Sequence, residues 1–207
     1  SARFDAQAYG PDCIGVRPCM VHWEPGTGIM ASYNLGVIAA TAAERVQKML
    51  ESAATFPMSM TFYSLWRRNL LLRFHEILHE LHPTGGGYTD WAMVLAYAST
   101  GNIYPDHSSL FVCNNSNWRL EIAPQAVTDL FISAGLGSRS KLFWPLLIAV
   151  DAFILIYRLD SPVSRLEAKD AAIVALMTYL RTFWKVTEQA LDSLTHEEKD
   201  AVDALLA

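Results

Sequence analysis

From about residue 30 onward, apolar residues recur at intervals of three and four positions, which places them on one face of an α-helix. Proline or glycine follows several of these segments, as at Pro57, Pro83 and Gly101, and both residue types end helices. The pattern predicts helices over about 30–54, 64–82, 90–100, 124–134, 142–157, 164–191 and 195–206. We therefore expect six or seven helices.

The C-terminal third has the clearest pattern. Residues 142–157 are apolar on almost every side, which predicts a central, buried helix. Ser164 and Glu167 have the spacing of a capping box, and they open a long helix to about Leu191. We expect one apolar stripe of this helix to face the helix before it. The stripe consists of Ile173, Met177, Leu180, Trp184 and Leu191.

The first 28 residues differ from the rest, because they are rich in glycine and proline and show no periodicity. We expect an irregular N-terminal arm over 1–28, which Trp23 could anchor, and a helical domain over 29–207. Residues 110–113 and 118–122 flank a polar turn and are compatible with one short β-hairpin. The predicted fold is a mainly α, single-domain bundle.

Composition narrows the functional classes. The chain has 207 residues, 52% of them apolar, which excludes a wholly disordered protein. Its net charge of −5 argues against a dominant nucleic-acid surface, and no apolar run reaches the ~18 residues of a membrane span. Three cysteines, an odd number, favour reduced thiols and a cytoplasmic location over a disulfide framework.

One motif carries recognisable chemistry. Residues 75–79 read His-Glu-Ile-Leu-His, which on a helix places His75 and His79 on the same side. Two imidazoles four positions apart can bind one zinc ion, and Glu76 could then act as general base toward a zinc-bound water. The spacing resembles that of the zincin metallopeptidases.

A catalytic zinc site needs a third protein ligand. Asp90 follows a glycine-containing turn, which resembles the aspzincin arrangement, and Glu121 is a second candidate. The resemblance is confined to residues 75–90. Leu78 and its apolar neighbours would form the core face of the same helix, with the histidines beside it at the boundary with solvent.

Other polar residues suggest binding or structural roles. Arg67, Arg68 and Arg73 form a small basic cluster that could contact phosphate or a nucleic-acid backbone. Asp151 lies within an apolar helix, so its carboxylate needs a partner, for which Arg158, Arg165 or a histidine of the 75–82 segment are candidates.

We interpret the sequence as that of a nonenzymatic helical protein that acts through protein–protein contacts. One specific form of this hypothesis is a self-assembling coat or scaffold subunit that forms homo-oligomers. We expect no cofactor and no membrane contact. The alternative is a zinc-dependent metallopeptidase, with His75, His79 and Asp90 as ligands and Glu76 as general base. Trp23 and the three arginines are the binding residues we expect.

Overall fold

The computed structural model describes residues 9–52, 58–82, 84–87, 89–114, 122–135, 144–158, 163–192 and 195–196. Several predictions fall outside these ranges. They concern the third-ligand candidate Glu121, the second strand of the predicted hairpin and most of the predicted last helix.

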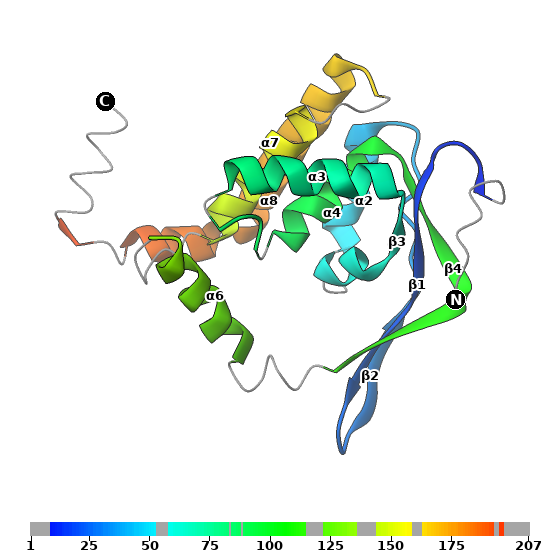
Figure 1. The fold of residues 1–207 in the computed structure, drawn as a ribbon, viewed down its shortest axis with the longest axis horizontal. Helices are drawn as coiled ribbons and strands as arrows, with labels where there is room; N and C mark the ends of the chain where they lie inside the picture. The colour runs from blue at the N-terminus through cyan, green and yellow to red at the C-terminus, as the bar shows by residue number, and fades with distance from the viewer. Residues whose placement is uncertain are drawn as a thin grey trace.

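Within the described residues, six α-helices accompany a four-stranded sheet (Figure 1). The strands are β1 (Cys13–Glu24), β2 (Gly28–Tyr33), β3 (Leu65–Trp66) and β4 (Asn102–Asn114). The helices are α2 (Ala42–Ser52), α3 (Arg68–Leu81), α4 (Asp90–Thr100), α6 (Ile122–Ser133), α7 (Trp144–Arg158) and α8 (Arg165–Asp192), and a 3₁₀ helix, η1, spans Met58–Tyr63. The fold is therefore mixed α/β, and the predicted mainly α bundle is wrong.

The sheet is built around β1. Residues 20–24 of this strand pair antiparallel with β2, and residues 15–16 pair antiparallel with β3. Along its other edge β1 runs parallel to β4, from Cys13 opposite Asn102 to Trp23 opposite Asn114. In Figure 1 the sheet lies on one side of the helices, and the β1–β2 ribbon extends beyond them.

Within the described part of the predicted irregular arm, residues 13–24 form β1 and residue 28 begins β2. The glycine and the proline within β1 lie at positions where a strand can accommodate these residue types. Pro18 lies where the pairing of β1 with β4 shifts register, and Gly15 lies where β1 meets the ring of Trp66. The alternation of apolar and polar residues is missing because β1 is buried on both faces over Cys13–Arg17.

The centre of the helical core is α4. Every residue from Ala92 to Thr100 is buried, and α4 packs against α2 and α7, while α8 covers α2 and α7. We expected this central place for α7, but α7 buries only one side, and Val150 and Tyr157 are exposed. Over the described residues, no helix has both the length and the apolar content needed to cross a membrane.

Candidate functional site

The predicted zinc residues do not form a site in the described part of the chain. His75, Glu76 and His79 lie on α3 with exposed side chains, and Glu76 pairs with Arg73 at 3.3 Å. Asp90 is the first residue of α4, where burial raises the pKa of its carboxyl. Among the described residues, no three His, Cys, Asp or Glu side chains are placed to hold one metal ion. The zinc alternative remains a prediction, because Glu121 is outside these residues.

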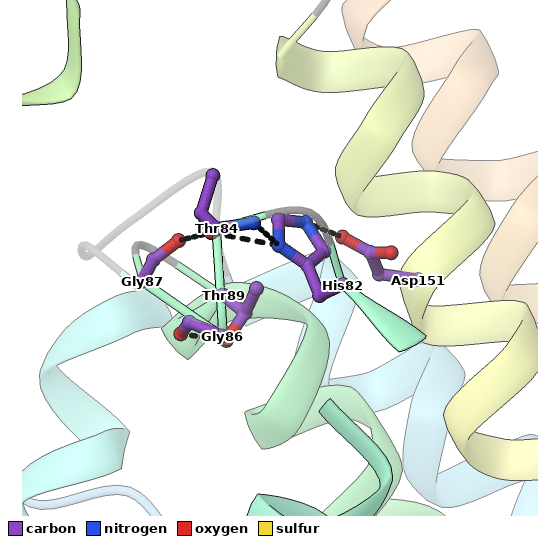
Figure 2. A network of polar contacts seen from close by, with 6 residues as sticks. All are labelled: His82, Thr84, Gly86, Gly87, Thr89 and Asp151. Carbon is purple, nitrogen blue, oxygen red and sulfur yellow. Dashed lines mark hydrogen bonds and ion pairs between the residues drawn. The ribbon is translucent and has the colours of Figure 1, made fainter. Parts of the chain in front are cut away.

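The histidine directly after α3 does have a defined environment, which we call the His82 centre: His82, Thr84 and Asp151 (Figure 2). His82 Nε2 lies 3.0 Å from the Asp151 carboxylate, and both side chains are largely buried. His82 Nδ1 lies 2.7 Å from the Thr84 hydroxyl and accepts the Thr84 backbone N–H at 3.2 Å. The expectation that Asp151 finds a partner is confirmed, and of the candidates Arg158, Arg165 and a histidine the partner is the histidine His82.

These contacts determine the tautomer of His82. Because Nδ1 accepts the Thr84 N–H, the ring proton of the neutral imidazole is on Nε2 and is donated to Asp151. The Thr84 hydroxyl has one proton, which it donates either to Nδ1 or to the Gly87 carbonyl at 3.2 Å. The centre therefore joins the end of α3, the glycine turn after it and the middle of α7.

Replacing Asp151 with alanine should lower the free energy of unfolding by about 1–3 kcal/mol, because the His82 Nε2–H would remain buried without an acceptor. Asp151→Asn keeps an acceptor oxygen, so it should lower the free energy of unfolding clearly less than Asp151→Ala does. Urea unfolding followed by circular dichroism measures both variants. Equal stability of Asp151→Ala and the wild type would show that the His82 centre does not stabilise the fold.

A larger polar feature lies near the other end of α3. It is a cavity of about 860 Å³, which we call the arginine cleft. Its charged lining consists of Asp12, Arg45, Arg67, Arg73 and Glu167. Two of the three arginines that we expected to bind a ligand, Arg67 and Arg73, are therefore brought together here. Arg68 is exposed and does not line the cleft.

Arg45 is the most buried charged residue of this cleft, with 5% of its surface exposed. Its guanidinium donates to the carbonyls of Ala98 and Ser99 at the end of α4, at 2.8 and 2.9 Å. It also donates to Ala39 and Ala40 before α2, at 3.1 and 3.2 Å. Burial lowers the pKa of Arg45.

The sequence contains a signal for the role of Arg45. Ala42, Val46 and Met49 form the buried face of α2, and Arg45 lies on that face between them. A charged residue among core positions needs a dedicated set of partners, as Asp151 does. Arg45 and Asp151 therefore share one sequence pattern, a charged residue among core positions.

Three members of the apolar stripe predicted to face α7, Ile173, Met177 and Trp184, are on the outside of α8. Leu180 is partly buried and packs against the core as predicted, and the side chain of Leu191 lies outside the described ones. The face that α8 buries is instead composed of small residues and one tyrosine: Ala168, Ala171, Ala172, Ala175 and Tyr179. Ile173, Met177 and Trp184 are 42, 45 and 50% exposed, and Leu166 on the same side is 69% exposed. We call these four residues the α8 stripe.

The sheet carries a second exposed apolar area. Trp23 and Ile29 lie opposite each other on β1 and β2, and Leu110 and Val112 lie on β4 beside Cys19 and Val21. Trp23, Ile29, Leu110 and Val112 are all exposed. The structure thus places the predicted anchor residue Trp23 on a strand with its side chain exposed, and not in an irregular arm.

No known protein family, curated protein or solved structure that was compared with the chain matches it. The functional interpretation therefore rests on the geometry of the α8 stripe, the sheet face, the His82 centre and the arginine cleft.

Proposed function

We propose that the protein is a nonenzymatic, self-associating subunit in which α8 packs antiparallel against α8 of a second copy. The observation that supports this proposal is the α8 stripe. Large apolar side chains exposed along one line of a helix are typical of protein–protein contact surfaces.

The stripe is straight. At 100° per residue, Leu166, Ile173, Met177 and Trp184 lie within about 20° of one line along α8, which is the geometry of a helix-packing face. From the first to the last of them the helix rises about 27 Å. A second helix of similar length can therefore contact all four side chains at once.

The spacing of the stripe is also symmetric about Ala175. Leu166 and Trp184 are each nine positions from it, and Ile173 and Met177 are each two positions from it. In an antiparallel pair centred there, Leu166 lies opposite Trp184 of the second copy and Ile173 lies opposite Met177. Such a self-complementary surface is what a twofold dimer interface requires.

The charges beside the stripe agree with the same pairing. Asp170 and Arg181 lie on one flank of α8, both are exposed, and neither forms an ion pair with another described residue. In a twofold antiparallel dimer the same flanks meet, so Asp170 of each copy lies beside Arg181 of the other. Opposite charges at this position favour a second copy over an unrelated helix.

Met177→Glu should weaken the dimer by at least about tenfold, because it places two carboxylates in the apolar centre of the interface. Sedimentation velocity over a range of protein concentrations measures the dissociation constant. Leu72→Glu is the matched control, since Leu72 is an apolar residue of α3 with a similar exposure of 42%. It should leave self-association unchanged.

Charge reversal tests the direction of pairing. Asp170→Arg and Arg181→Asp should each weaken the dimer, and the double variant should restore it, because only the double variant again places opposite charges side by side. A wild-type protein that is monomeric at all accessible concentrations would contradict the proposal. A dimer that survives Met177→Glu but is lost on substitution of Trp23 would assign the contact to the sheet face instead.

A further inference from the structure

The α8 stripe is too small to form a whole dimer interface. Its four side chains are between 42 and 69% exposed, so at about 200 Å² for a fully exposed large side chain they present roughly 400 Å². Each partner of a stable interface of standard size buries about 800 Å². A dimer through α8 therefore needs further surface beside the stripe.

A groove of about 630 Å³ lies between α2 and α8, and we call it the α2–α8 groove. It is lined by one residue of α8 and by six residues from α2 and the segment just before it. They are Val174, and Ala39, Ala40, Ala43, Glu44, Gln47 and Lys48. Three of the seven are alanines, and small side chains at a contact let another helix approach closely.

The groove lies on the flank of α8 that carries Asp170 and Arg181. At 100° per residue, these two residues lie about 40° and 60° from the line of the stripe, and Val174 lies about 80° from it on the same side. The surface therefore continues from the stripe, across the two charged residues, into the α2–α8 groove. A helix that covers the stripe comes close to this groove.

Two hydrogen bonds set the position of α2 along α8. Glu167 Oε1 accepts the Ala42 N–H at 2.8 Å, and the Thr178 hydroxyl donates to Gln47 Oε1 at 3.3 Å. α2 thus runs in the same direction as α8. Interpolation between the two contacts places about position 46 of α2 level with the centre of the stripe.

The two charged residues of the groove are symmetric about that level. Glu44 is two positions before position 46, and Lys48 is two positions after it. On α8, Asp170 likewise precedes the centre of the stripe and Arg181 follows it. A twofold axis at this centre therefore brings Glu44 of each copy level with Lys48 of the other.

Both side chains can take a further ion-pair partner. Lys48 Nζ donates to the Ile38 carbonyl at 2.6 Å, and Glu44 Oε2 accepts the Thr41 N–H at 3.0 Å. An ammonium has three donors and a carboxylate has two acceptor oxygens, so these contacts leave bonding capacity. The hydrogen bonds from Thr41 lower the pKa of Glu44, which keeps its carboxylate charged at neutral pH.

From this arrangement we propose that the second copy covers the α2–α8 groove with its own α2. This proposal rests on the α8 dimer proposed above and makes it a four-helix contact, with α2 and α8 from each copy. Glu44 and Lys48 of one copy pair with Lys48 and Glu44 of the other beside the apolar stripe. An apolar centre with a polar rim is the common anatomy of protein interfaces, and opposite charges at the rim fix the orientation of the partner.

Lys48→Glu tests the contact between the two α2 helices. It places like charges together twice in each dimer, so it should weaken the dimer by about tenfold at low salt, as measured by sedimentation velocity. Arg68→Glu is the matched control. It makes the same change of net charge on an exposed residue of α3 that does not line the groove, and it should dissociate like the wild type.

Glu44→Gln should have an effect whose sign depends on residue 48. Glutamine keeps an oxygen to accept the Thr41 N–H, so the start of α2 is preserved. Alone, Glu44→Gln should weaken the dimer several-fold, because it loses the attraction to Lys48 of the second copy. Added to Lys48→Glu, it should strengthen the dimer several-fold, because it removes the repulsion. A loss of fold stability would act in the same direction in both backgrounds.

Cross-linking measures the contact directly. A carbodiimide joins a carboxylate to an amine that touches it, and a mixture of isotopically light and heavy copies shows which links join two chains. We expect a link of mixed mass between Glu44 and Lys48 in the wild type and a much smaller amount in Met177→Glu.

The outcomes separate this proposal from the α8 dimer on which it rests. A dimer that Met177→Glu disrupts, but that Lys48→Glu leaves unchanged and that gives no link of mixed mass, would overturn the contact through α2 and leave the α8 contact intact. A protein that forms no dimer at any concentration would contradict both.

Discussion

Replacing Arg45 with methionine should lower the free energy of unfolding by about 3–5 kcal/mol, because the carbonyls of Ala39, Ala40, Ala98 and Ser99 lose their donors at once. Methionine has a similar length and fills much of the same space, so the loss reports the hydrogen bonds more than a cavity. Urea unfolding followed by circular dichroism gives the value.

Lys48→Met is the matched control for Arg45. Lys48 lies on the same helix and donates to one carbonyl, that of Ile38 at 2.6 Å, but this contact is exposed. Its loss should cost less than about 1 kcal/mol, since water replaces the donor. If both methionine variants were equally stable, Arg45 would not be the residue that joins α2 to the end of α4.

Gly15→Ala should be the most damaging of the single-methyl additions to the sheet, with a loss of about 3 kcal/mol. A Cβ at this position would lie 2.5 Å from the Trp66 ring and 3.2 Å from the Leu65 carbonyl. The ring cannot move away easily, because it stacks on the buried Tyr97 with 4.1 Å between the ring centroids. Thermal and urea unfolding measure the effect.

Gly26→Ala separates crowding from backbone strain. Gly26 has a φ of +84° and open space around its Cβ position, so alanine there is strained but meets no atom within 4 Å. The expected cost is about 1–2 kcal/mol. A Gly15→Ala variant as stable as Gly26→Ala would mean that Trp66 does not pack tightly against β1.

α7 and α8 could be predicted because their signals are local. α8 begins at Arg165 directly after Ser164, which accepts the Glu167 N–H as in the predicted capping box. The other half of that box is absent in the described structure, because the Glu167 side chain reaches Ala42 of α2 instead. The position of Glu167 in the first turn of α8 was thus predicted correctly, but its side chain contacts α2 and does not cap α8.

Most of the sheet could not be predicted in the same way, because β1 pairs with β3 and β4 from distant parts of the chain. Only the β1–β2 hairpin, with Pro25 and Gly26 at its turn, is local. Residues 30–33 continue a helical pattern into 42–52, yet the structure places them in β2, where Tyr33 pairs with Met20. The helix begins only after Thr41, whose hydroxyl and backbone N–H form a capping box with Glu44. That box is a local sequence signal for the true start of the helix.

The side of α8 that is buried was predicted wrongly for Ile173, Met177 and Trp184, whereas Leu180 packs against the core. Large apolar residues are usually taken as the core side of a helix, but α8 packs on α2 and α7 through alanines, which allow a close approach. Sequence alone shows that a stripe exists and not which partner covers it. The arginine cleft could not be predicted from the sequence either, because its residues come from separate elements. Arg45 belongs to α2, whereas Arg67 and Arg73 belong to the segment around α3.

The parallel pairing of β1 with β4 has a consequence for the order of folding. Cys13 and Asn102 are neighbours in the sheet but 102 − 13 = 89 positions apart in the chain. Closing so long a loop has an entropic cost that the first few contacts do not offset. Strand pairs of this kind therefore form late in folding. During synthesis β1 leaves the ribosome before α2, η1, α3 and α4. It can therefore pair with β4, its longest partner strand, only after these elements have been made. Until then a strand that is buried in the finished protein is exposed, which is the interval in which aggregation competes with folding.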